Sequence, residues 1–344
     1  MKNNIFLIVI SLLSFISCQR DPSLEIAESE KEIKFYVPQG FPPAHYQFTN
    51  NPITQKGFEL GRSLFYDPIL SKDNTISCGS CHQLHAAFAH SDHALSHGIN
   101  GLFGNRNSPA LFNTAWWTSF FWDGGVNHIE VQPIAPITNP VEMDETLANV
   151  IAKLQAHPNY PSRFNQAFGS DSITSQNMLR ALAQFMGAMI SADSKYDKYI
   201  RQENGVTLTN AELNGMNIFN AKCATCHTPP LFTDFSFRNN GLYATFPVDS
   251  GRARITGDVN DIGKFKVPSL RNIVVTKPYM HDGSINQLAD VLEHYNSGIQ
   301  SSATLDPLLS SGISLSNQEK SDLLSFLATL TDYTFINDQR FAEQ

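Results

Sequence analysis

Two short segments of this 344-residue sequence share the spacing Cys-x-x-Cys-His, and this spacing is suited to one particular chemistry. The first segment is Cys78-Gly79-Ser80-Cys81-His82 and the second is Cys223-Ala224-Thr225-Cys226-His227. Two thiols at this spacing can add to the two vinyl groups of a haem, while the histidine that follows ligates the iron. The motifs therefore predict two covalently bound c-type haems, with His82 and His227 as iron ligands.

Two other uses of paired cysteines remain open. Four thiolates from the two pairs could hold a zinc ion, and each pair could close a local disulfide. A zinc site would leave both histidines without a role. The sequence has five cysteines in all, and apart from Cys18 they fall into the two identical motifs with none left over.

The N-terminus has the features of an export signal. Lys2 supplies a positive charge, and residues 5–16 form an apolar run that is too short to span a bilayer. The run ends in Ser17-Cys18, which resembles the lipobox of bacterial lipoproteins, so residues 1–18 are predicted to be a signal peptide with Cys18 as the lipidated residue. An ordinary cleaved signal with an incidental cysteine is the alternative. Either reading predicts export to the periplasm. If Cys18 is lipidated, the lipid anchor is the only membrane attachment that we expect.

Composition and charge limit the function classes. The chain is 42% hydrophobic and carries a formal net charge of −8, with no basic run that could neutralise phosphates. Nucleic-acid binding is therefore not expected, whereas an acidic surface would suit a basic redox partner. The length allows two domains, which we place at residues 51–203 and 204–344, preceded by a charged and proline-containing tether at residues 19–50.

Helical signals dominate the predicted folded part. A distant internal repeat places Gly61-Arg62-Ser63-Leu64-Phe65 before the first cysteine motif and Gly215-Met216-Asn217-Ile218-Phe219 before the second. Capping boxes, Thr209 with Glu212 and Ser316 with Glu319, open two helices, the latter running through Leu330. Further helices are expected over residues 146–155 and 176–190. The predicted fold is mainly α, with two cytochrome c-like haem domains, long loops and few short strands.

The chain resembles the bacterial di-haem cytochrome c peroxidases and their relative MauG. Beyond the haem motifs, the resemblance covers about residues 50–335 and rests on Arg106-Asn107-Ser108-Pro109, Phe121-Trp122-Asp123-Gly124, Asn139-Pro140-Val141-Glu142-Met143, Val267-Pro268-Ser269-Leu270-Arg271-Asn272 and Pro278-Tyr279-Met280-His281-Asp282-Gly283. It implies that the N-terminal haem is the peroxide site and that the C-terminal haem receives electrons.

The resemblance also implies roles for single residues near the first haem. Glu142 matches the catalytic glutamate that moves a proton between the two peroxide oxygens, and Gln132 and Pro136 match its companions. Taken by spacing alone, Glu142 could instead be one of several carboxylates before a helix. Trp122 matches the tryptophan that relays electrons between the haems, and this role is favoured over the alternative that it is only a core aromatic side chain.

Sixth ligands and a calcium site are the remaining implied features. His97 occupies the place of the histidine that caps the first iron in many family members, but a neighbour in its histidine-rich loop could do so, or the site could be open. At the second haem, Tyr295 stands where cytochrome c peroxidases have a methionine ligand, and MauG also has a tyrosine there. Met280 is the other candidate for this ligand. Asn107, Thr276 and Pro278 match a calcium site of the family.

These features favour a peroxidase that reduces hydrogen peroxide to water with electrons from a small c-type cytochrome or cupredoxin. The alternatives are a MauG-like oxidase that acts on a partner protein, which Tyr295 favours, and a di-haem electron carrier in which both irons are capped. The family commonly forms dimers, which implies a homodimer as one form of this chain.

Overall fold

The computed structural model describes residues 33–91 and 93–344, so the predicted signal peptide, Cys18 and the first part of the tether lie outside the described residues. The helices are α2 (Gln55–Tyr66), α3 (Cys78–Cys81), α4 (Ile134–Thr138), α5 (Leu147–Ala156), α6 (Tyr160–Phe168), α7 (Ser175–Ala188), α8 (Lys195–Ile200), α9 (Asn210–Lys222), α10 (Ala253–Thr256), α11 (Leu288–Glu293), α12 (Asn317–Ala328) and α13 (Tyr333–Ile336). The strands are β1 (Phe237–Arg238) and β2 (Phe265–Lys266).

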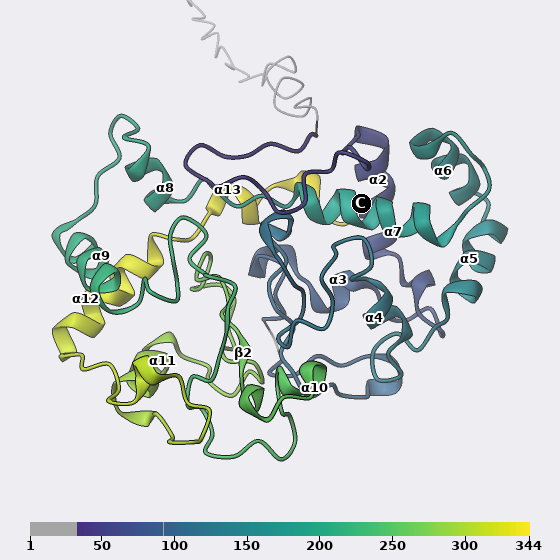
Figure 1. The fold of residues 1–344 in the computed structure, drawn as a ribbon. Coiled ribbons are helices and arrows are strands. Elements are labelled where there is room, and N and C mark those ends of the chain that lie inside the picture. Colours follow the sequence, from purple (N-terminus) through teal and green to yellow (C-terminus); the bar gives the residue numbers. More distant parts are fainter. Residues whose placement is uncertain (1–32, 92) are drawn as a thin grey trace, which may run out of the picture. The chain divides into compact units, whose positions relative to one another are not determined.

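The prediction of a mainly helical fold with few short strands is confirmed. In the described part of the chain, β1 and β2 form one antiparallel two-stranded sheet, in which Phe237 lies opposite Lys266. Long loops connect the helices and occupy much of the space between them (Figure 1). None of the described helices combines the length and apolar character needed to cross a bilayer.

The first pair of packed helices, α2 and α7, builds the core around the first cysteine motif. The Thr54 side chain accepts a hydrogen bond from the Gly57 backbone N–H and so begins α2, while Thr174 caps α7 in the same way. The buried face of α2 includes Phe58, Leu64 and Phe65. A Cβ atom at Gly61 would overlap with the Ala181 carbonyl oxygen, so only glycine allows the two backbones to lie this close.

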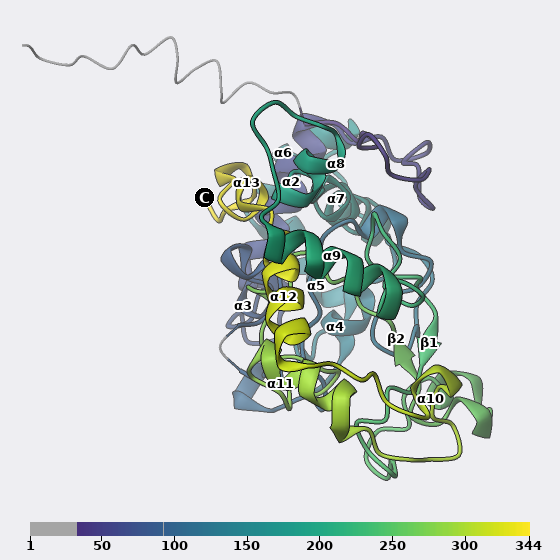
Figure 2. The same ribbon diagram turned by 90° about the vertical axis from the view of Figure 1, so that its left-hand side faces the viewer.

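The second pair, α9 and α12, repeats this arrangement around the second motif (Figure 2). Both predicted capping boxes are present, with Thr209 and Glu212 at α9 and Ser316 and Glu319 at α12. Helix α12 ends at Ala328 rather than running through Leu330 as predicted, and Leu330 is fully buried in the turn that follows.

The two copies of the internal repeat, at residues 61–65 and 215–219, make the same kinds of contact in the structure. A Cβ atom at Gly215 would overlap with the Asp322 carbonyl oxygen, just as one at Gly61 would overlap with that of Ala181. The aromatic residues four positions later, Phe65 and Phe219, are both buried and each lines the cavity beside its own cysteine motif. The repeated Gly-x-x-x-Phe pattern therefore sets a close helix crossing and one wall of a cavity.

Two hydrophobic cores lie within residues 33–344, which form one compact unit. The first core draws mainly on residues 33–192 and the second mainly on residues 196–330. The C-terminal segment returns to the first core, where Phe335, Ile336 and Phe341 are buried. A domain boundary between residues 203 and 204 stays a prediction, and this returning segment would cross it.

The end of the predicted tether differs from expectation. Ile33, Ala44 and Phe48 are buried in the first core, and the Phe35 ring lies 5.8 Å from that of Trp116. A tether would leave these side chains in solvent. Apolar residues spaced irregularly among prolines give no helical or strand period, so their burial was not evident from the sequence.

Two candidate haem cavities

The first cavity is built over the turn α3, which carries the first cysteine motif. Cys78, Cys81 and His82 line it together with Phe65 of α2 and Met186 of α7. Both cysteines are free thiols, so the structure contains no local disulfide at this motif. The space between the atoms of this cavity is about 610 Å³, including its mouth.

The His82 imidazole is oriented for use as a metal ligand. Its Nδ1 lies 2.7 Å from the Phe88 carbonyl oxygen, which leaves Nε2 as the nitrogen that can bind a metal. Burial lowers the pKa of His82 to about 4, so the ring is neutral at physiological pH. A neutral, hydrogen-bonded imidazole is the form that ligates iron.

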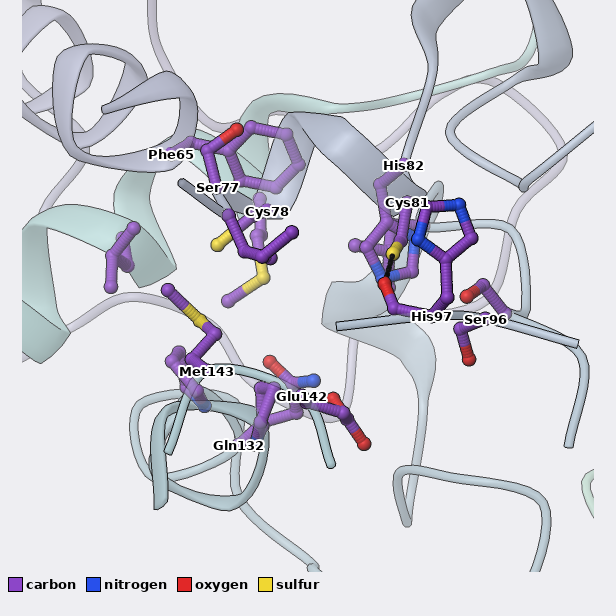
Figure 3. A pocket seen from close by; sticks show the side chains of 17 residues that line it. Phe65, Ser77, Cys78, Cys81, His82, Ser96, His97, Gln132, Glu142 and Met143 are labelled. Carbon is purple, nitrogen blue, oxygen red and sulfur yellow. Dashed lines mark hydrogen bonds between the residues drawn. The ribbon is translucent and has the colours of Figure 1, made fainter. Parts of the chain in front are cut away.

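The predicted catalytic group lies in the same cavity. Glu142, Gln132 and Pro136 line it, and Figure 3 shows Glu142 and Gln132 on the opposite side from Ser77 and Cys78. The Asn139 side-chain amide donates a hydrogen bond of 2.8 Å to Glu142 Oε1. Burial raises the pKa of Glu142, and this hydrogen bond works against that rise.

His97, the candidate capping residue, also lines the first cavity. Its carbonyl oxygen lies 3.7 Å from Cys81 Sγ. Its ring, however, lies with two other histidines, with centroids 4.8 Å from that of His93 and 5.8 Å from that of His90.

The second cavity follows α9 and is larger, with about 2320 Å³ of space between its atoms including the opening. Cys223, Cys226 and His227 line it, and both cysteines are again free thiols. His227 Nδ1 lies 3.3 Å from the Phe232 carbonyl oxygen and 3.2 Å from that of Pro268, which leaves Nε2 for a metal. The two motifs thus present the same donor arrangement.

Both candidates for the sixth ligand of the second haem line this cavity. Tyr295 lies in the π-helical turn His294–Gly298, directly after α11. Burial raises the pKa of Tyr295 to about 12, and a hydrogen bond with Asn240 opposes this rise. Asn240 also lies near Met280, with its Nδ2 3.4 Å from Met280 Sδ. Asn240 therefore contacts both rival ligands.

A short backbone segment separates the two cavities. Ser108 lines both of them, and its neighbours Asn107 and Pro109 line the second. Trp122 lies on the second cavity's side, where its Nε1 donates a 2.9 Å hydrogen bond to the Asn107 carbonyl oxygen. The backbone N–H of Lys266 donates to the Trp122 carbonyl oxygen at 2.8 Å, so Trp122 is held from both sides.

The three residues of the predicted calcium site are all found around the second cavity. Asn107, Thr276 and Pro278 line it. The Asn107 side-chain amide donates to the Ala94 carbonyl oxygen at 3.0 Å, which leaves Oδ1 available as a hard oxygen donor.

The thiols fit covalent haem better than a redox-active dithiol. Burial raises the pKa of Cys78 to about 12 and that of Cys223 to about 11. Catalytic dithiols have lowered pKa values instead. Four free thiols and two neutral imidazoles in two roomy cavities are the donor set that two c-type haems require.

Sequence reasoning missed the two asparagines that hold the predicted functional side chains, Asn139 beside Glu142 and Asn240 beside Tyr295. Asn139 stands within the segment that carries the family resemblance, three residues before its partner, and this spacing is the signal that could have identified it. Asn240 lies 55 positions before Tyr295 and has no local signal.

Comparison with known proteins agrees with this geometry. The family model for di-haem cytochrome c peroxidase matches residues 55–205. The methylamine utilization protein MauG of Methylophilus methylotrophus is 34% identical over 303 residues, covering 86% of this chain and 88% of its own. The cytochrome c551 peroxidase of Nitrosomonas europaea is 36% identical over 240 residues, covering 68% of this chain and 71% of its own. The chain belongs to the di-haem cytochrome c peroxidase and MauG family.

A solved structure extends this similarity to the fold. A crystal structure described as a MauG-like protein associated with microbial copper homeostasis superposes with a TM-score of 0.82 at 35% identity, covering 89% of this chain and 97% of that chain. As a member of the di-haem peroxidase family, the chain is an enzyme with two c-type haems.

Proposed function

We propose that the chain reduces hydrogen peroxide to water in the first cavity, with electrons that a small c-type cytochrome or cupredoxin delivers to the second. The observation that carries the proposal is the position of Glu142, which faces the Cys78 and His82 side of the first cavity from the opposite wall. A carboxylate in this place can handle the protons of a peroxide bound between the two walls.

The protein's own part of the reaction is proton handling and positioning. When bound, the two haems would supply the iron that receives peroxide and the electrons that reduce it, with His82 and His227 as their ligands. Glu142 takes the proton from one peroxide oxygen and returns it to the other as the O–O bond breaks. The balance of two electrons and two protons per peroxide yields two water molecules.

Three residues near Glu142 would support this proton transfer. The Asn139 amide holds Glu142 Oε1 and so fixes the direction of the carboxylate. Gln132 is buried on the same wall, where its amide can orient a small polar substrate. Pro136 completes that wall with an apolar surface that limits the number of water molecules near the carboxylate.

We assign the electron path between the cavities to Trp122. Its indole lies on the second cavity and is hydrogen-bonded to the backbone segment that separates the two cavities. In the second cavity, we propose that Tyr295 would hold the haem iron together with His227, with Met280 as the rival of Tyr295. A calcium ion held by Asn107, Thr276 and Pro278 would stiffen the same wall.

A MauG-like oxidase that acts on a partner protein is the second candidate function. Two observations favour it: Tyr295 lines the second cavity, and the MauG-like crystal structure covers most of the chain at 35% identity. A phenolate ligand stabilises higher oxidation states of iron than a methionine does. Held by His82, His227 and Tyr295, the two haems would supply oxidising equivalents for a side chain of the partner protein.

The location that we propose is the periplasm. The short apolar run near Lys2 supports export, and lipidation of Cys18 would anchor the chain to a membrane without a spanning helix. A homodimer is the assembly that the family resemblance suggests.

Peroxide turnover by the haem-loaded protein tests the proposed function. With a reduced c-type cytochrome as donor, we expect rapid turnover by the native chain and a loss of about 10²–10⁴-fold in Glu142→Gln, because the variant cannot move the proton. Asp144→Asn is the matched control, since Asp144 pairs with Lys72 outside the cavity. Negligible native turnover, combined with a haem spectrum that changes on peroxide addition, would favour the MauG-like oxidase instead.

A further inference from the structure

A group of three histidines stands beside the first cavity. The side chains of His90, His93 and His97 place one imidazole nitrogen each within 4.8 Å of the others. His93 Nδ1 and His90 Nε2 lie 3.3 Å apart. His90 is buried, His97 is half-buried and His93 is exposed, so the group reaches from the protein interior to the surface.

We propose that His90, His93 and His97 form a binding site for a transition-metal ion that prefers imidazole ligands, a class that includes Zn²⁺ and Cu²⁺. Three imidazole nitrogens within 4.8 Å of one another can supply three of the ligands that such ions take in proteins. Calcium and magnesium require oxygen donors, so this site differs in chemistry from the calcium site proposed above. The inference goes beyond the proposed function and does not depend on it.

Residues 94–99, which include His97, are held in place from several sides, and this lowers the entropy cost of fixing the His97 ring. The Asn107 side chain donates to the Ala94 carbonyl oxygen at 3.0 Å. Gly283 packs directly against Ala94, where an added Cβ atom would overlap with the backbone. The loop therefore contacts the second half of the chain as well as the first.

The far end of the loop is fixed to the backbone of Glu142. The Ile99 N–H donates to the Glu142 carbonyl oxygen at 2.8 Å, and a Cβ atom at Gly98 would overlap with the same backbone. His97 thus belongs both to the histidine group and to the wall of the first cavity. A metal ion on the three histidines would hold the His97 ring and prevent it from capping the first haem.

Metal titration of the haem-loaded protein tests this site. Haem loading is necessary because the four thiols of the two cysteine motifs would otherwise bind the same ions. Any affinity tag must be removed, and Zn²⁺ and Cu²⁺ are titrated separately. Calorimetry gives the stoichiometry and affinity, and the Cu²⁺ electron paramagnetic resonance spectrum gives the number of nitrogen ligands.

We expect one equivalent of metal in the native protein and binding at least about tenfold weaker in His93→Ala. Even partners outside the first coordination shell alter metal affinity by about 10–100-fold, so loss of a ligand should cost at least as much. His93 is the residue to replace because its exposed side chain can be removed without opening the core.

His85→Ala is the matched control. His85 is an exposed histidine of the same region, hydrogen-bonded to Ser91 Oγ at 3.2 Å, and it does not belong to the group. It should keep the native affinity and the native copper spectrum. The proposal is overturned if neither ion binds in a one-to-one ratio, if His93→Ala binds as tightly as the native protein, or if His85→Ala loses as much affinity as His93→Ala.

Discussion

Glu142 illustrates how one residue acquires a special role from its surroundings. Its position in the first cavity was predicted from the sequence segment around it, but its partner Asn139 was not. Because the hydrogen bond depends on the turn that follows α4, it could be located only once the fold was known. The same holds for Asn240, whose contact with Tyr295 joins a loop to a π-helical turn that is far away in the sequence.

The pKa of Glu142 predicts the acid side of the pH profile. Glu142 must be ionised to accept a proton from peroxide, so activity is lost as the pH falls through its pKa. Burial raises that pKa, so the acid limb of kcat/KM should lie above the ordinary glutamate value of about 4.3. Among the residues lining its cavity, the other titratable groups are Cys78, Cys81, His82 and His97.

Removal of the Asn139 amide should move the acid limb of the pH profile to still higher pH. Because the hydrogen bond favours the ionised carboxylate, Asn139→Ala should shift the limb to higher pH in a plot of log kcat/KM. Asn149→Ala removes a similar amide that donates to Glu145 at 3.1 Å outside the cavity, and it should leave the limb in place. A limb that both variants leave unmoved would argue against Glu142 as the proton acceptor.

Tyr295 can be separated from Met280 by spectroscopy. If the phenol ligates the second haem, Tyr295→Phe should change the optical and paramagnetic resonance spectra of that haem, and Met280→Leu should leave them nearly unchanged. Both variants preserve most of the side-chain volume. The reverse pattern would assign the ligand to Met280 and weaken the case for a MauG-like oxidase.

At the scale of helices, local sequence signals were informative. The capping residues Thr209 and Ser316 begin α9 and α12 where the sequence places them, because a side-chain oxygen satisfies free backbone N–H groups at a helix start. The end of α12 at Ala328 was less accurately predicted. Leu330 continues the apolar period of the helix but is buried after the chain has left it.

Replacing Gly215 by alanine should destabilise the protein, although alanine has the higher helix propensity. On an isolated helix, Gly→Ala stabilises by roughly 0.5–1 kcal/mol. In α9 the new Cβ atom would overlap with the Asp322 carbonyl oxygen, so Gly215→Ala should lower the free energy of unfolding by about 1–3 kcal/mol. Urea unfolding followed by circular dichroism measures the change.

The neighbouring Asn214→Ala provides the control, since Asn214 is exposed on the same helix. It should change stability by no more than about 0.5 kcal/mol. If Gly215→Ala proved as stable as this control, the close approach of α9 and α12 would not be required for the fold.

At the scale of the whole molecule, the sequence predicted least. The two cores correspond roughly to the two cysteine motifs, but residues 33–50 and the C-terminal segment both join the first core. These contacts connect segments that are far apart in the sequence, and short irregular stretches carry no periodic pattern that would indicate their partners.

Because the C-terminal segment packs on the first core, a substitution in it should destabilise helices near the N-terminus. The Phe341 ring lies 5.8 Å from Phe58 and 6.2 Å from Phe185, on α2 and α7 respectively. Phe341→Ala should therefore destabilise the first core by about 3–5 kcal/mol. Native-state proteolysis mapped by mass spectrometry should show new cleavage within residues 55–188.

Tyr333→Ala is the control for this experiment, because Tyr333 lies in the same C-terminal segment and its side chain is 64% exposed. It should leave the cleavage pattern unchanged. Cleavage that appeared instead within residues 210–328 would mean that the C-terminus supports the second core.

The walls of the first cavity also constrain how the protein can be assembled. Leu182 and Met186 of α7 face the motif at Cys78, so that wall is missing until a chain roughly one hundred residues longer has emerged. Without α7, the two thiols lack the cover that Leu182 and Met186 give them in the folded chain. We therefore expect haem to attach more readily before the first helix pair closes than after it.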